Sequence, residues 1–165
     1  MERKRLNLGC GDKKRKGCIN IDIRGEVNPD VVCDCRDLSA FAANSVEEII
    51  ADDILEHFNW FNVRKILQEW IRVLQPGGFL IVKTPDIDKI FRDKEKLVKM
   101  KGGDITSRFS ALLFGKQDYP ENAHKVCFDK KFFLEFLPKK YPIRTVIIDD
   151  IPDTYNIKII MEKIR

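Results

Sequence analysis

The chain has 165 residues, of which 44% are hydrophobic and 34% charged, and its formal net charge is +4. This composition predicts one soluble globular domain over residues 1–165 and excludes a disordered or membrane-embedded chain. The charged N-terminus is not followed by an apolar run, so we expect neither an export signal nor a membrane span and predict a cytoplasmic protein. High Lys, Glu and Ile contents with only three Gln residues favour a thermophilic source.

The first half of the chain alternates short apolar segments with turn residues. Apolar residues recur with helical spacing over 62–74, and Pro76-Gly77-Gly78 ends this helix because proline cannot continue it. The run 79–83 is continuously apolar, which predicts a parallel strand buried on both faces. Four further strands are expected, at 5–8, 18–23, 30–34 and 46–51.

The second half is less regular but continues the alternation of helices and strands. Gly102-Gly103 breaks a helical stripe, residues 115–127 read as a loop, and Asp129 is expected to cap the last helix. The expected helices are 87–100, 105–114 and 129–137, and the expected strands are 144–149 and 155–161. This order predicts an α/β protein with a Rossmann-like, doubly wound and mostly parallel sheet.

A nucleotide-type pocket is predicted at the start of the chain. The strand at Leu6 runs into the turn Gly9-Cys10-Gly11, and the next strand ends on Asp22. Only ten residues separate Gly11 from Asp22, too few for a full crossover helix, so the first crossover helix is expected to be reduced. A third glycine is absent, with Lys13 in its place, which argues against a dinucleotide dehydrogenase.

At this point the chain resembles the class I S-adenosylmethionine-dependent methyltransferases, in particular the small bacterial and archaeal proteins of the methyltransferase-11 type. The resemblance covers roughly residues 5–86, about half the chain, and consists of five segments in order. These are Leu6-Asn7-Leu8-Gly9-Cys10-Gly11, Ile19-Asn20-Ile21-Asp22-Ile23, Cys33-Asp34-Cys35-Arg36-Asp37-Leu38, the stretch from Asn44 to His57, and Leu74-Gln75-Pro76-Gly77-Gly78.

The resemblance implies S-adenosylmethionine as cofactor and gives roles to the residues at the strand ends. Asp22 would accept hydrogen bonds from the ribose hydroxyls. Asp34 would bind the adenine amino group, with the Cys35 amide on a ring nitrogen and Asp37 as an alternative, and Asp52 would lie near the sulfonium. The implied cofactor-binding set is Leu8, Gly9, Cys10, Gly11, Asp22, Ile23, Asp34, Cys35, Asp37 and Asp52. An Asp at a strand end can also be a turn former only.

Methyl transfer from a sulfonium is an in-line displacement, and a base is needed only if the acceptor must lose a proton. The candidates for such a catalytic residue are Asp53, His57 and His124. His124 lies in a substrate-lid insertion expected around 101–127. The alternative is that each histidine only packs a loop onto the sheet.

The methyl acceptor is predicted to be a small molecule, for example a glycan or lipid-linked intermediate, by analogy of fold. The basic run Lys13-Lys14-Arg15-Lys16 keeps open an RNA- or protein-directed methyltransferase. The departures from the family pattern at Asn7 and Lys13 keep open a non-catalytic partner subunit with the same fold.

The five cysteines form an odd number without the spacing of a disulfide framework. A zinc site built from Cys10, Cys18, Cys33 and Cys35 would lack paired C-x-x-C spacing. We therefore expect free cysteines, with Cys33 and Cys35 on one face of a strand as small buried hydrophobes, and the sequence predicts no metal site.

Overall fold

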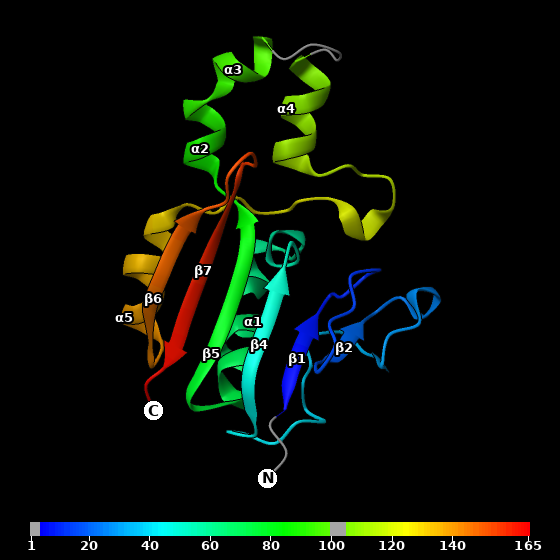
Figure 1. The fold of residues 1–165 in the computed structure, drawn as a ribbon, viewed down its shortest axis with the longest axis vertical. Coiled ribbons are helices and arrows are strands. Elements are labelled where there is room, and N and C mark those ends of the chain that lie inside the picture. Colours follow the sequence, from blue (N-terminus) through cyan, green and yellow to red (C-terminus); the bar gives the residue numbers. More distant parts are fainter. Residues whose placement is uncertain (1–3, 100–104) are drawn as a thin grey trace.

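The computed structural model describes residues 4–99 and 105–165 and contains one seven-stranded sheet (Figure 1). The strand order is β3-β2-β1-β4-β5-β7-β6, and β7 runs antiparallel to its two neighbours. The strands are β1 (Arg5–Leu8), β2 (Ile19–Asp22), β3 (Val31–Val32), β4 (Val46–Asp52), β5 (Leu74–Pro85), β6 (Ile143–Asp150) and β7 (Asn156–Lys163). The predicted α/β class and mostly parallel, Rossmann-like sheet are confirmed.

The central strands are held in register by rows of buried apolar side chains. Leu8 pairs with Ala51, which pairs with Val82, and Val82 in turn lies opposite Ile159. All four side chains are fully buried and point to the same face of the sheet. This face carries the hydrophobic core.

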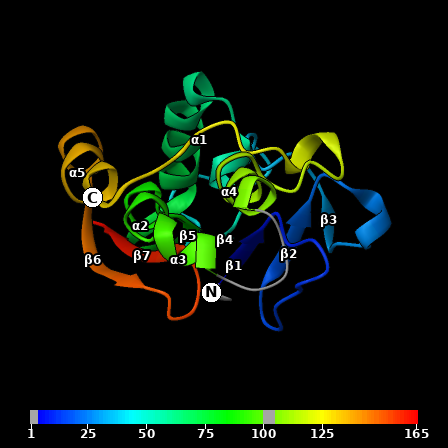
Figure 2. The ribbon, with the colours of Figure 1, turned by 90° about the horizontal axis from the view of Figure 1, so that it is seen from above.

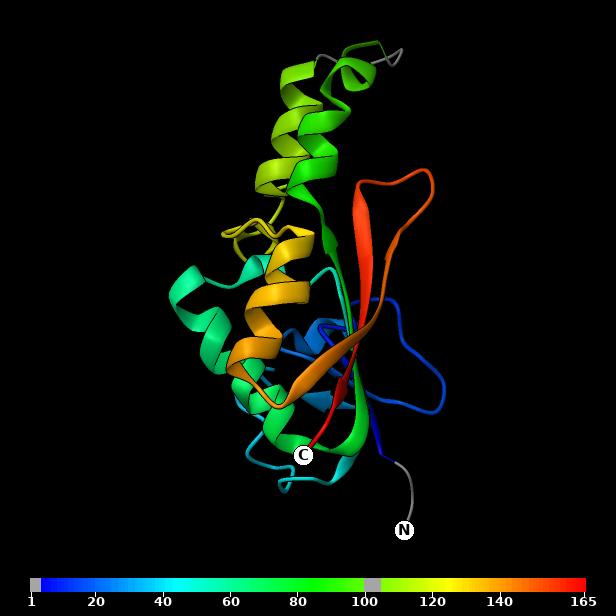
Figure 3. The ribbon, with the colours of Figure 1, turned by 90° about the vertical axis from the view of Figure 1, so that its left-hand side faces the viewer.

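Among the described residues, the helices that pack on the sheet lie on this core face (Figure 3). The first is α1 (Trp60–Val73), which starts two residues before the predicted helix and buries the expected stripe, including Trp70. The last is a π-helical segment, Phe132–Phe136, that continues into α5 (Leu137–Lys140). Asp129 caps it as predicted, because its Oδ1 accepts the Phe132 amide at 2.8 Å.

The opposite face of β5 is partly open to solvent. Phe79 is 37% exposed and Ile81 is half-buried, whereas Leu80 and Val82 on the core face are fully buried. The prediction that 79–83 is buried on both faces is therefore wrong. The physical reason is that the helices packed on the sheet, within the described residues, cover only its core face, so the second face of β5 meets solvent (Figure 3).

The Pro76-Gly77-Gly78 turn also differs from the prediction, because it lies inside β5. The helix already ends at Val73, and Pro76-Gly77-Gly78 bulges out of β5 instead of stopping α1. Leu74 pairs with Val46 and Phe79 pairs with Glu48, so four residues of β5 lie opposite one residue of β4. A left-handed φ of +77° at Gly77 allows this bulge.

The reduced first crossover is confirmed, because residues 9–18 form turns and loop instead of a helix. Side-chain amides tie this loop to the sheet. Asn7 Nδ2 donates to Asn20 Oδ1 at 2.9 Å and to the Lys13 carbonyl at 3.1 Å, and Asn20 Oδ1 also accepts the Arg15 amide at 2.7 Å. Asn7, which departs from the family pattern, thus has a structural role in a crossover that lacks a helix.

Three helices extend beyond the carboxyl ends of the strands (Figures 1 and 2). They are α2 (Ile87–Arg92), α3 (Lys94–Lys99) and α4 (Ile105–Phe114), so the predicted helix 87–100 is interrupted at Asp93. The predicted break at Gly102-Gly103 lies outside the described residues. The chain returns across the end of the sheet through 115–128, with a short 3₁₀ turn at Pro120–Asn122.

The cysteines are free, and Cys10 and Cys35 are buried, whereas Cys127 is exposed. Within the described ranges they do not gather into a metal-ligating cluster. Across the same ranges, no helix has the length and apolar character needed to cross a membrane.

Candidate active site

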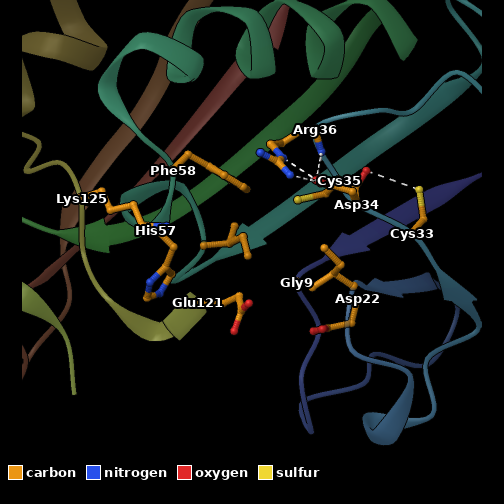
Figure 4. Close-up of a pocket in the computed structure, with 12 residues that line it drawn as sticks. Gly9, Asp22, Cys33, Asp34, Cys35, Arg36, His57, Phe58, Glu121 and Lys125 are labelled. Atoms are coloured by element: carbon orange, nitrogen blue, oxygen red, sulfur yellow. Dashed lines mark hydrogen bonds and ion pairs between the residues drawn. The ribbon is translucent and has the colours of Figure 1, made fainter. Parts of the chain in front are cut away.

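A cavity of about 260 Å³ opens at the carboxyl ends of β1, β2 and β4 (Figure 4). Gly9 and Asp22 lie on one side, with Asp34 and Cys35 next to them, and His57 and Lys125 lie on the opposite side (Figure 4). The lining residues are Gly9, Asp22, Ile23, Cys33, Asp34, Cys35, Arg36, Ile54, His57, Phe58, Glu121 and Lys125. The end of a parallel sheet next to the strand-order reversal is where open α/β folds bind ligands.

Gly9 is required by both conformation and space. Its φ is +60°, and a Cβ atom there would lie 2.3 Å from Ile54 Cδ1, a side chain that also lines the cavity. Gly11 also has a left-handed φ, of +48°, and its amide donates to Asp22 Oδ2 at 2.7 Å. The glycine turn is therefore fixed to the strand-end acid and exposes backbone to the cavity.

Asp22 is buried, with 5% of its surface exposed. In addition to the Gly11 amide, it binds Arg24: Oδ1 accepts the Arg24 amide at 2.9 Å and its Nε at 3.3 Å. The guanidinium of Arg24 in turn lies over the ring of Tyr119, 4.9 Å from its centroid. An ionised carboxylate has about four acceptor positions, so Asp22 retains capacity for a ligand hydroxyl.

The residues directly after β3, from Cys33 to Arg36, form another wall of the cavity. Burial opposes the ionisation of Asp34, but the hydrogen bonds and charge of Arg36 outweigh it and lower the pKa of that carboxyl. The Arg36 Nε donates to Asp34 Oδ2 at 2.7 Å. Cys35 is anchored by Trp70, whose indole Nε1 donates to the Cys35 carbonyl at 2.8 Å, and burial raises the pKa of the Cys35 thiol. Helix α1 thereby holds this wall in place.

A second hollow, of about 220 Å³, meets the first at Gly9. It lies between the glycine turn and Asp52, whose Oδ2 is 2.6 Å from a guanidinium nitrogen of Arg15. Its lining residues are Asn7, Gly9, Cys10, Lys13, Lys14, Arg15 and Asp52.

Three residues of the implied cofactor set, Leu8, Gly11 and Asp37, line neither hollow. Asp37 Oδ1 accepts the Ser39 amide at 2.9 Å and lies toward α1, beside Glu69 and Arg72. The Leu8 side chain is fully buried in the core, which leaves only its backbone to face a ligand.

The three catalytic candidates are in different environments. Asp53 is held by an ion pair with Lys83 at 2.5 Å and by Asn156 Nδ2 at 2.6 Å. His57 lines the cavity, whereas His124 lies behind it, with the two ring centroids 5.0 Å apart. Burial lowers the pKa of both histidines, and the proximity of His57 lowers the pKa of His124 further. Both rings are therefore predominantly neutral at neutral pH.

Several lining residues were missed from the sequence. Ile54 and Phe58 flank the Glu56-His57 pair, and Glu121 and Lys125 belong to the returning loop. The loop is fixed by backbone bonds, since the Lys125 amide donates to the Glu56 carbonyl at 2.7 Å. The glycine at position 115 is a sequence signal for this loop, because the chain turns tightly there. Its φ is +74°, and a Cβ atom would lie 2.2 Å from the Asn122 carbonyl oxygen.

The strand order, the single antiparallel strand and the cavity at the glycine turn define a class I methyltransferase architecture. Residues 16–82 match the methyltransferase domain family. Comparison with curated proteins gave no match.

Solved structures share the fold at low sequence identity. The PH0226 protein from Pyrococcus horikoshii OT3 superposes with a TM-score of 0.67 at 18% identity, covering 99% of this chain and 82% of that chain. A Haloferax volcanii methyltransferase in complex with the Trm112 activator gives 0.65 at 13% identity, covering 99% and 84%. The 1,6-didemethyltoxoflavin-N1-methyltransferase from Burkholderia thailandensis, with bound S-adenosylhomocysteine, gives 0.66 at 11% identity, covering 98% and 71%.

The fold is that of the class I S-adenosylmethionine-dependent methyltransferases, and the match to the methyltransferase domain family covers residues 16–82 of this chain.

Proposed function

We propose that the protein transfers a methyl group from S-adenosylmethionine to a small-molecule acceptor that enters between the glycine turn and the returning loop. The observation that carries this proposal is the cavity itself. Its floor is made by the strand-end residues Gly9 and Asp22, and its opposite wall by Glu121 and Lys125 of the loop. The loop thus acts as a substrate lid over the reaction site.

The residues present fit the cofactor. Gly9 presents backbone without a side chain at the cavity wall, and Asp22 offers a buried carboxylate with acceptor capacity for ribose hydroxyls. Asp34 and the backbone of Cys35 would hold the adenine. The second hollow would take the methionine end, with Asp52 as the carboxylate for its ammonium group and the basic loop for its carboxylate.

When bound, S-adenosylmethionine supplies a methyl group on a positively charged sulfur that is already a good leaving group. The protein has to align the acceptor and exclude water. Among the three catalytic candidates, His57 reaches the cavity and is kept neutral by burial, so it is suited to take a proton from an acceptor hydroxyl. Asp53 is engaged with Lys83 and Asn156, and His124 supports the lid.

The basic loop favours a small acceptor over RNA. Arg15 turns inward to Asp52, and Lys14 Nζ donates to the Asn28 carbonyl, so two of its four cations already bind groups of the protein. The Burkholderia neighbour, which has this fold, was solved with the small molecule 1,6-didemethyltoxoflavin bound. The Haloferax neighbour, solved with an activator protein, keeps a partner-dependent enzyme as the second candidate.

Calorimetric titration with S-adenosylhomocysteine tests the cofactor site. Asp22→Ala is expected to weaken binding by about 5- to 150-fold, which corresponds to about 1–3 kcal/mol for lost charge-assisted hydrogen bonds. The matched control is Asp149→Ala, an exposed acid on β6 at the far edge of the sheet, which should bind like the wild type. Equal affinity of all three proteins would show that the ribose role of Asp22 is misassigned.

Methyl transfer from labelled cofactor into a cell extract tests the acceptor class. The extract is separated into small molecules, protein and nucleic acid after the reaction, and label is expected in the small-molecule fraction. Label in the protein or RNA fraction would overturn the small-molecule assignment. The same reaction with His57→Gln should lose most of its rate if the histidine accepts the proton.

A further inference from the structure

We propose that Glu56, His57 and His124 form a binding site for a divalent transition-metal ion of the zinc type, beside the cofactor cavity. The chain contains two histidines, and the fold brings both to this place from segments far apart in sequence. One ligand atom from each of the three side chains lies within 4.8 Å of the others. Among the residues that the structure describes, no other three metal-ligating side chains bring their ligand atoms this close together.

Glu56 provides the observation that points to a ligand. Glu56 is only 2% exposed, and its Oε2 accepts a hydrogen bond from the Thr84 hydroxyl at 3.1 Å. Its Oε1 is fully enclosed and has no hydrogen-bond partner among the residues the structure describes. A buried oxygen without a partner costs free energy, and a bound cation would remove that cost.

The two imidazoles are oriented as metal ligands usually are. Nδ1 of His57 lies 3.2 Å from the Ala123 carbonyl oxygen, and Nδ1 of His124 lies 3.2 Å from that of Leu112. Because a carbonyl oxygen only accepts, the tautomer protonated at Nδ1 satisfies both contacts and leaves each Nε2 a lone pair for a metal ion. A backbone carbonyl on the distal nitrogen is the outer-shell arrangement that fixes ligating histidines in metalloproteins.

Two imidazoles and one carboxylate select the class of metal. This donor set is found in mononuclear zinc sites and in the facial sites of non-haem iron, whereas Mg²⁺ and Ca²⁺ prefer oxygen ligands. Zinc bonds of about 2.0–2.1 Å place tetrahedral ligand atoms roughly 3.4 Å apart, so the three side chains have to move together by about an ångström. Three protein ligands leave a position for water or for an acceptor oxygen.

The site has a consequence for the reaction, and this part rests on the proposed function. His57 lines the cofactor cavity, so an ion held by it would lie next to the acceptor. A bound metal ion lowers the pKa of a coordinated hydroxyl. In the metal-bound protein the ion would therefore replace His57 as the group that favours loss of the acceptor proton.

The test is metal binding by protein purified without a histidine tag and stripped with a chelator. Co²⁺ is titrated and followed by its visible absorption bands, and Zn²⁺ is titrated by calorimetry. The wild type should give one class of site without a thiolate-to-cobalt charge-transfer band. Glu56→Gln and His124→Gln should each weaken binding at least about tenfold.

Cys127→Ser is the matched control, because Cys127 lines the hollow behind His124 and is also a possible metal ligand. This variant should bind both ions like the wild type. Circular dichroism of each metal-free variant confirms that it is folded, and the two glutamine variants are read independently in case one is not.

Absence of binding to the wild type, or binding that survives the loss of His124, would overturn the proposal. Dependence on Cys127 or on the other cysteines would do the same. The titration needs no cofactor, and cofactor binding is measured in the presence of chelator. Failure of the metal site therefore leaves the methyltransferase proposal standing, and failure of the latter leaves the metal site standing.

Discussion

Glu56→Gln should change how the stability of the metal-free protein depends on pH. Burial raises the pKa of Glu56 from 4.5 to about 8 in the folded protein, because its carboxyl is enclosed and Oε1 lacks a partner within the described residues. Between these two pH values the unfolded chain has an ionised carboxylate while the folded protein keeps the proton. The free energy of unfolding contributed by Glu56 is thus fully present below pH 4.5 and is lost as the pH rises to about 8.

The magnitude follows from the size of the shift. One pKa unit corresponds to about 1.4 kcal/mol, so a change from 4.5 to about 8 gives an upper limit of about 5 kcal/mol. The lowered pKa values of His57 and His124 act in the opposite direction, since their contribution is present above pH 6.5 and is lost as the pH falls through their folded pKa. The comparison of wild type with Glu56→Gln leaves mainly the glutamate contribution, because both proteins contain the two histidines.

The assay is urea unfolding of both proteins at several pH values between 5 and 8, in the presence of chelator. The glutamine variant should gain stability relative to the wild type by a few kcal/mol as the pH rises across this range. Glu121→Gln, a change of an exposed glutamate in the lid, should leave the wild-type pH profile unaltered. A difference between Glu56→Gln and wild type that is constant from pH 5 to pH 8 would show that the Glu56 carboxyl keeps an ordinary pKa in the folded protein.

Two further substitutions test the elements that position the site. Gly9→Ala should lower the free energy of unfolding by about 2–4 kcal/mol, because the left-handed φ costs about 1–2 kcal/mol and the new Cβ meets Ile54. The double variant with Ile54→Ala should remove the clash but still carry the loss of the Ile54 side chain. A Gly9→Ala protein as stable as wild type in urea unfolding would contradict this prediction. Lys163→Met should lower the free energy of unfolding by about 2–4 kcal/mol, because the buried ammonium donates at 2.7 Å to the carbonyls of Ile71 and Leu74 beside the end of α1. The control is Lys158→Met, an exposed change on the same strand, which should have little effect on stability.

The features that sequence patterns determine locally were predicted well. The helix predicted over 62–74, which is α1 (Trp60–Val73), follows from apolar spacing, and β1 with the turn at Gly9 follows from a strand that runs into glycines. The short crossover before Asp22 follows from chain length alone. These signals depend on neighbouring residues, so a single sequence contains them.

The remaining features depend on tertiary contacts. The pairing of His57 with His124 is set by the path of the returning loop, which no local pattern specifies. Lys163 reads as an exposed residue near the chain end, yet it is buried and holds backbone carbonyls. The run at Phe79 predicted a strand covered on both sides, because hydrophobicity does not tell whether a helix or solvent faces it.

The last helix was also predicted only in part from the sequence. Its position and its cap at Asp129 were predicted, but the π-helical turn was not. The Leu137 amide donates to the carbonyl of Phe132, five residues back, and Pro138 has no amide to donate to the usual partner. A proline is visible in the sequence, but whether it widens, kinks or ends the helix is decided by packing.

A crystal structure grown with saturating S-adenosylhomocysteine is the most direct test of the account. We expect the adenosyl group between the glycine turn and β3, with its ribose hydroxyls on the Asp22 carboxylate and its amino-acid end toward Asp52. Electron density for the ligand elsewhere, or a cavity still filled by solvent while Asp22 keeps only Gly11 and Arg24, would contradict the assignment of this cavity as the cofactor site.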